Sequence, residues 1–133
     1  MNKVVALLGS SILVASASVA LAAQPCREDG QCTVFQVAVK LPYKANSKTV
    51  DANETIYIGG QPNYYQSTVT MQGDSCSKEV RVPSPVYNTI MEIMESMSSN
   101  DAPPPVLTPA QQTILLFYST LMQQTMGFTC SQQ

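Results

Sequence analysis

The first half of the chain alternates between apolar and polar positions, which is the pattern of half-buried β-strands. The longest such stretch spans residues 33–41, and shorter ones follow at 54–58, 65–72 and 79–82. The segments between them are too short for the crossover that parallel pairing requires. The pattern therefore predicts a small antiparallel β-meander of three to four strands.

Turn residues separate these stretches. Residues 42–53 are polar and rich in Asn, Ser and Lys, residues 59–63 contain two glycines and a proline, and residues 73–75 are Gly-Asp-Ser. Clusters of this kind between alternating segments are typical of turns and loops. We expect the chain to reverse direction at each of them.

The second half of the chain has the helical period instead. Ser84 followed by proline predicts a helix start, and the apolar positions that follow recur on one side of the helix up to Met97. A second helix is predicted to begin at Thr108, where Thr-Pro-Ala-Gln matches a capping box, and to end before Gly127. The expected fold is α+β, with the small meander packed against a C-terminal helical hairpin and stapled by disulfides.

Residues 1–22 have the features of a secretory signal peptide. A single charge at Lys3 precedes an apolar stretch, and Ala-Leu-Ala at residues 20–22 fits the small-x-small cleavage pattern. A membrane anchor is the alternative, but glycine and serine interrupt the stretch, and its apolar parts fall short of the roughly 20 residues that a span needs. We predict cleavage, export to the periplasm or beyond it, and a single small disulfide-bonded domain at residues 23–133 with no membrane span.

All four cysteines follow the predicted cleavage site, at Cys26, Cys32, Cys76 and Cys130. An even number of cysteines in an exported chain predicts disulfides. Three pairings are possible, and the sequence does not select one. We favour Cys26–Cys32 with Cys76–Cys130, because the Asp-Gly turn dipeptide lies between the first two sulfurs. The chain contains no C-x-x-C motif and no zinc-type spacing, so that structural disulfides are favoured over redox or metal chemistry.

The composition excludes several classes of function. The sequence has no histidine, which removes Ser-His-Asp and Cys-His catalysis and the histidine-based zinc sites. Seven basic and nine acidic residues leave a net charge of −2, which argues against a nucleic-acid partner. We assign no catalytic, cofactor-binding or metal-binding residue and expect no cofactor.

Two chemical alternatives are attached to the first helix. Met91, Met94 and Met97 form a stripe of thioethers, the ligands that suit Cu(I), so that a periplasmic copper binder is one alternative. The stripe shares the apolar face of the helix, which favours core packing. Glu92 and Glu95 suggest a small carboxylate-based enzyme acting on cell-wall sugars, but both glutamates fall on the opposite, solvent face.

The strongest functional signal is the absence of charge in the C-terminal region. No charged side chain follows Asp101, although solvated helix faces normally carry charge and interface cores are depleted of it. We predict that another protein or a second copy of the chain covers the polar side of the second helix. The candidate residues are Leu116, Thr120, Gln123 and Gln124.

A second candidate surface is the tyrosine-containing segment at residues 57–65. Its composition, with Tyr57, Tyr64 and Tyr65 around a glycine-rich turn, suits recognition, whereas an ordinary hairpin connection is the alternative. The overall expectation is a small exported, non-catalytic protein that acts by protein–protein interaction, such as an accessory component of an envelope assembly.

Overall fold

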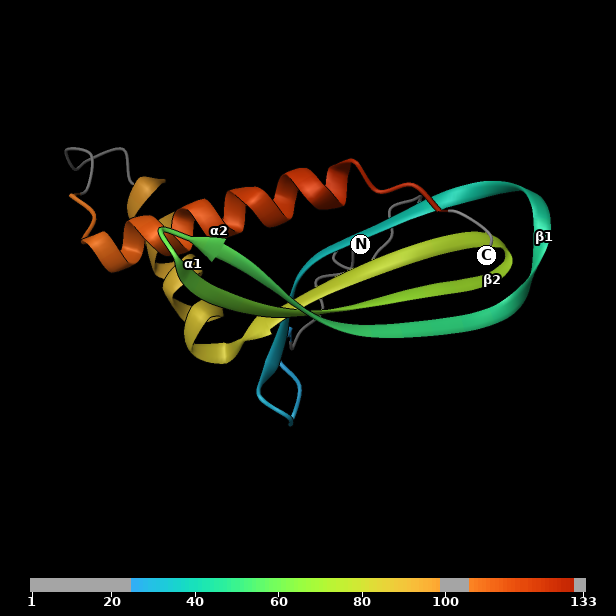
Figure 1. The fold of residues 1–133 in the computed structure, drawn as a ribbon, viewed down its shortest axis with the longest axis horizontal. Coiled ribbons are helices and arrows are strands. Elements are labelled where there is room, and N and C mark those ends of the chain that lie inside the picture. Colours follow the sequence, from blue (N-terminus) through green and yellow to red (C-terminus); the bar gives the residue numbers. More distant parts are fainter. Residues whose placement is uncertain (1–24, 99–105, 131–133) are drawn as a thin grey trace.

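The computed structural model describes residues 25–98 and 106–130, and the predicted signal peptide lies outside these ranges. The elements follow one another in the order β1 (Gln31–Ile58), β2 (Gln61–Pro83), α1 (Ser84–Met97) and α2 (Pro109–Met126). The two strands pair antiparallel into one ribbon, and both helices lie beside the end that holds its tip (Figure 1). The predicted α+β class is therefore confirmed.

The predicted number of strands is wrong, because the structure has two long strands in place of three to four short ones. Of the segments expected to be turns, residues 73–75 lie opposite the start of residues 42–53, and the rest of that longer segment, residues 48–53, pairs with residues 66–71 of β2. Pairing continues through them, for example at Ala45↔Gly73. Two neighbouring turn segments thus become one bend in a continuous ribbon, and they do not separate strands.

The bend has a physical cause in the register. From the pair Lys40↔Ser75 to the pair Lys48↔Met71, β1 advances eight positions while β2 advances four. Extra residues in one strand of a pair bend the ribbon and increase its twist. Gly73 lies at this level with a φ of 61°, a conformation that a residue without Cβ adopts at little cost. Figure 1 shows the ribbon folded back on itself at the end remote from the helices.

The tip of the ribbon is a tight two-residue turn. Ile58 pairs with Gln61, and the residues between them, Gly59 and Gly60, have φ angles of 59° and 81°. A positive φ at both central positions is the requirement of a type I′ hairpin turn, and a Gly-Gly pair meets it without strain. The expected loop at residues 59–63 is therefore shorter than predicted, since strand pairing resumes at Gln61.

A buried arginine ties the two halves of the bent ribbon together. The Arg81 guanidinium donates hydrogen bonds to Glu79 Oε1 at 2.9 Å and to Thr68 Oγ1 at 2.9 Å. Thr68 in turn donates to Asp51 Oδ1 at 2.6 Å. Thr68 and Arg81 lie on opposite sides of the bend, so that these contacts hold the two halves of the ribbon together. The Glu79 carboxylate lies beside the buried Arg81 guanidinium and balances its charge.

The two helix starts differ in how their first N–H groups are bonded. The prediction that Ser84 is the cap residue of α1 is wrong, because the helix begins at Ser84 itself, with Pro83 in the cap position and no side-chain cap. The Ser84 N–H instead donates to the Gly30 carbonyl at 2.8 Å. Helix α2 has the predicted capping box, in which the Gln111 N–H donates to Thr108 Oγ1 and the Thr108 N–H donates to Gln111 Oε1. The start of α1 is therefore fixed by a tertiary contact and that of α2 by its own sequence.

The main core lies between the helices and the tip half of the ribbon. Its fully enclosed members come from both strands and both helices: Tyr65, Val80, Val82, Ile90, Phe117 and Leu121. A smaller cluster of Leu41, Met71 and Cys76 lies towards the bend, with Phe128 and Cys130 packed against it. The structure pairs Cys26 with Cys32 and Cys76 with Cys130, which is the pairing that the sequence favoured. The second disulfide joins the chain after α2 to the ribbon.

Candidate binding surfaces

The predicted interaction face of α2 is largely accessible. Leu116 is 57% exposed, although it lies next to the fully buried Phe117. Gln123 is also exposed, and Thr120 between them is half-buried. The spacing of these three residues places them on one side of the helix. We call this line of Leu116, Thr120 and Gln123 the outer face of α2.

Gln124 lies at the edge of the outer face and not at its centre. The hydroxyl oxygen of Tyr65, from β2, lies 3.3 Å from Gln124 Oε1, so that this side chain is directed toward the ribbon. The four residues predicted for the interaction therefore divide into three on the outer face and one that contacts β2. Helical spacing alone places Gln124 close to Thr120, and only the position of the ribbon separates them.

The predicted recognition segment is likewise divided by the pleat of the ribbon. Tyr57 is 70% exposed and Tyr64 is 62% exposed, whereas Tyr65 is buried against the helices. Neighbouring residues of a strand point to opposite faces, so that the Tyr64 side chain is exposed while that of Tyr65 packs against the helices. The inclusion of Tyr65 among exposed recognition residues is therefore corrected.

Tyr65 has a structural role in the core. Its ring packs on Phe117 with 6.2 Å between ring centroids, and its hydroxyl donates to the Glu54 carboxylate. Burial raises the pKa of Tyr65, and the hydrogen bond and negative charge of Glu54 raise it further. Burial also raises the pKa values of Tyr87 and Tyr118. The folded state therefore favours the neutral form of three phenols.

We expect the free energy of unfolding to fall as the pH rises above about 10. In the unfolded chain these phenols ionise near their ordinary pKa of about 10. The unfolded state then holds fewer protons than the folded state, so that the stabilisation is complete below this pH and is lost above it. Urea unfolding between about pH 8 and pH 11, with tyrosinate absorbance as a second signal, measures the effect. Tyr65→Phe should flatten the decline, and Tyr57→Phe, which removes an exposed phenol, serves as the control; equal profiles for both variants would contradict the expectation.

The helical periodicity of α1 predicts the positions of its glutamates correctly but not those of all its methionines. Met94 packs against the main core, but Met91 and Met97 are exposed, so that core packing is wrong for two of the three methionines. Met91 and Met97 are separated by about 9 Å along the helix axis at 1.5 Å per residue. Glu92 and Glu95 are both exposed, as the helical periodicity predicts.

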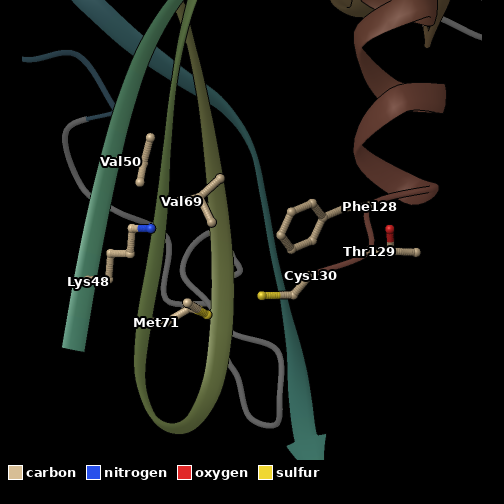
Figure 2. A pocket seen from close by; sticks show the side chains of 7 residues that line it. All are labelled: Lys48, Val50, Val69, Met71, Phe128, Thr129 and Cys130. Carbon is tan, nitrogen blue, oxygen red and sulfur yellow. The ribbon is translucent and has the colours of Figure 1, made fainter. Parts of the chain in front are cut away.

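An apolar groove lies between the bend half of the ribbon and the segment that follows α2 (Figure 2). Its volume is about 310 Å³, and its walls are Lys48, Val50, Val69, Met71, Phe128, Thr129 and Cys130. The Cys76–Cys130 disulfide holds the Phe128 wall in place, and the Lys78 ammonium lies 5.7 Å from the centre of the Phe128 ring. Sequence analysis did not anticipate this groove, because its walls come from segments far apart in the chain.

A polar pocket of about 370 Å³ lies on the tip half of the ribbon. Its lining residues are Gln31, Asn53, Glu54, Thr55, Tyr64, Tyr65, Gln66 and Pro83. Most of them come from facing positions of β1 and β2. Gln31 and Pro83 pair with each other at the first position of the register, at the open end of the ribbon. The predicted recognition residue Tyr64 thus belongs to a formed cavity and not to a flexible loop.

Comparisons with protein-family models, curated proteins and solved structures find no match for this chain. Within residues 25–98 and 106–130, no cluster of three or more His, Cys, Asp or Glu side chains has the geometry to hold a metal ion. Neither described helix is long and apolar enough to cross a membrane. The two disulfides are consistent with an exported protein.

Proposed function

We propose that this protein is a small exported, non-catalytic protein that acts in the periplasm or after secretion by binding a protein through the outer face of α2. The observation that carries the proposal is Leu116, which is 57% exposed in the middle of an 18-residue helix. That helix contains no charged residue. Solvated helix faces normally carry charge, whereas the centres of protein interfaces are depleted of it. An accessory role in an envelope assembly would use such a surface.

The partner that we propose for the outer face is a second copy of the chain. In a twofold symmetric contact each copy presents the same surface to the other, so that a charged face would oppose like charges. The outer face carries no charge, and therefore two copies meet without this penalty. Leu116 supplies the apolar centre, and Thr120 and Gln123 supply both hydrogen-bond donors and acceptors around it.

We expect the wild type to be a dimer and the double variant Leu116→Asp/Gln123→Asp to be a monomer. Two carboxylates placed on each copy would meet their equivalents across the twofold axis, and like charges in contact cost several kcal/mol. Light scattering coupled to size-exclusion chromatography measures the mass. The matched control is Asn88→Asp, which adds a carboxylate at an exposed position of α1 and should leave the dimer intact.

Two results would contradict this proposal. A wild type that is monomeric over the whole accessible concentration range would exclude self-association through the outer face. A dimer that persists in the double variant would place the contact elsewhere on the molecule. Urea unfolding of each variant confirms that a change in mass does not come from unfolding, since both substituted side chains lie outside the core.

A further inference from the structure

The exposed tyrosines share one face of the ribbon with four residues of the polar pocket, Asn53, Thr55, Tyr64 and Gln66, whereas Glu54 and Tyr65, which also line the pocket, alternate to the other face. In an antiparallel pair, residues opposite each other point to the same side. Asn53 pairs with Gln66, Thr55 with Tyr64, and Tyr57 with Pro62. These six residues therefore lie on one face, which we call the tip face. The opposite face carries Tyr65, which packs on Phe117 of α2, so that the tip face is directed away from α2.

Polar side chains contribute to the lining of the pocket on the tip face. They belong to Gln31, Asn53, Thr55 and Gln66, and among the described residues Gln31 Oε1 is buried without a hydrogen-bond partner. Three of them are amides, and each amide offers both donors and an acceptor. A ligand with many groups that both donate and accept would satisfy this lining.

The charged side chains in the pocket lining restrict the class of ligand further. Glu54 is the one charged side chain among the described residues that line this pocket, and its carboxylate accepts the Tyr65 hydroxyl. The lining thus lacks the lysine or arginine that phosphate and carboxylate ligands require. Its walls combine the apolar surfaces of Tyr64, Tyr65 and Pro83 with the amides of Gln31, Asn53 and Gln66, a mixture that suits a ligand with both C–H faces and hydroxyl groups. A neutral, hydroxyl-rich ligand fits better than an anion or a lipid.

Two exposed tyrosine rings at the rim of the pocket provide a surface on which a ligand can stack. Tyr64 lines the pocket, and Tyr57 is its diagonal neighbour on the same face, with both rings largely exposed. Diagonal neighbours of this kind lie about 7–8 Å apart. An exposed tyrosine presents a rigid apolar face with a polar end, and the C–H side of a sugar ring stacks on such a face while its hydroxyls reach neighbouring polar groups.

We propose that the tip face is a carbohydrate-binding site for a neutral oligosaccharide. One sugar unit stacks on Tyr64 and hydrogen-bonds to the amides of Asn53 and Gln66 in the pocket. The next unit along the chain lies over Tyr57. The site uses a different surface from the outer face of α2, and the inference does not depend on the proposed dimer.

Isothermal titration calorimetry of the disulfide-bonded protein with three neutral probes tests this proposal: cellohexaose, maltohexaose and chitohexaose. We expect at least one probe to bind with one site per chain. Tyr64→Ala and Gln66→Ala should each weaken that binding by about tenfold or more, as for the central residues of other binding sites, and Tyr57→Ala should weaken the hexamer more than the corresponding disaccharide. Tyr43→Ala is the matched control, because Tyr43 is an exposed tyrosine of β1 at the bend and does not line the pocket; it should bind as the wild type does.

Several outcomes would overturn the proposal. One is the absence of binding by all three hexasaccharides at about 10 mM, a concentration that detects even millimolar affinity. Another is binding that Tyr64→Ala and Gln66→Ala leave unchanged. A third is an equal loss in the Tyr43→Ala control, which would indicate a general effect on the ribbon. Urea unfolding of every variant separates a loss of binding from a loss of fold.

Discussion

Replacing Cys76 and Cys130 together with serine is expected to lower the free energy of unfolding by about 4 kcal/mol. The disulfide joins residues 54 positions apart, and a cross-link removes more conformational freedom from the unfolded chain as the loop that it closes becomes longer. Cys76 is also fully buried, so that a serine there places a hydroxyl in an apolar cluster. Urea unfolding under oxidising conditions, followed by circular dichroism, measures the change.

The Cys26–Cys32 disulfide provides the matched control. It closes a loop with a sequence separation of only 6, for which the same loop-entropy relation gives about 2 kcal/mol. The double variant Cys26→Ser/Cys32→Ser should therefore lose clearly less stability than the first. An equal or larger loss in this variant would contradict the loop-length argument. It would indicate that the contacts around Cys32 outweigh the entropy of the unfolded chain.

Phe117→Ala is expected to cost about 3–5 kcal/mol, the usual range for removing a fully buried aromatic side chain. Phe117 has no exposed surface and belongs to the main core, where its ring meets that of Tyr65 from the ribbon. Its loss leaves a cavity at the place where α2 contacts β2. The midpoint of urea unfolding should fall strongly, and near-ultraviolet circular dichroism of the tyrosines should weaken.

The neighbouring residue gives a sharp comparison for this substitution. Leu116→Ala changes the next position of the same helix, but its side chain is largely exposed. Exposed substitutions usually change stability by no more than about 0.5 kcal/mol. Because the proposed dimer covers Leu116, any loss for Leu116→Ala beyond this value should depend on protein concentration, whereas the loss for Phe117→Ala should not. Similar small losses for both would mean that α2 is not docked on the ribbon as described.

Elements with local signals could be predicted from the amino-acid sequence. The capping box at Thr108 and Gln111 fixes the start of α2, because both of its hydrogen bonds lie within four residues. The alternation of residues 33–41 predicted extended chain there, since a strand's period of two follows from backbone geometry alone. The pairing of Cys26 with Cys32 was favoured from a turn dipeptide between them. Each of these inferences depends on residues close together in the chain.

Other features followed from the tertiary structure alone. The segments at residues 42–53 and 73–75 each have the composition of a turn, but the register places residues 73–75 opposite the start of the longer segment and pairs residues 48–53 with residues 66–71, so that two long strands with one bend result. Helical periodicity placed Met91 and Met97 in the core, but the core covers a narrower part of α1 than its apolar arc. The position of a packing partner decides which apolar side chains are buried, and periodicity gives only the side of the helix.

The candidate sites show the same division. Composition indicates Tyr57 and Tyr64 as candidate residues, and the lack of charge around Leu116 indicates that residue. All three are exposed in the structure. The sequence does not predict that Gln31 and Tyr64 line one pocket, because the register between β1 and β2 and the fold of the ribbon bring them together. The sequence gives the chemical character of each residue. The neighbours of that residue depend on long-range packing, which involves the whole chain.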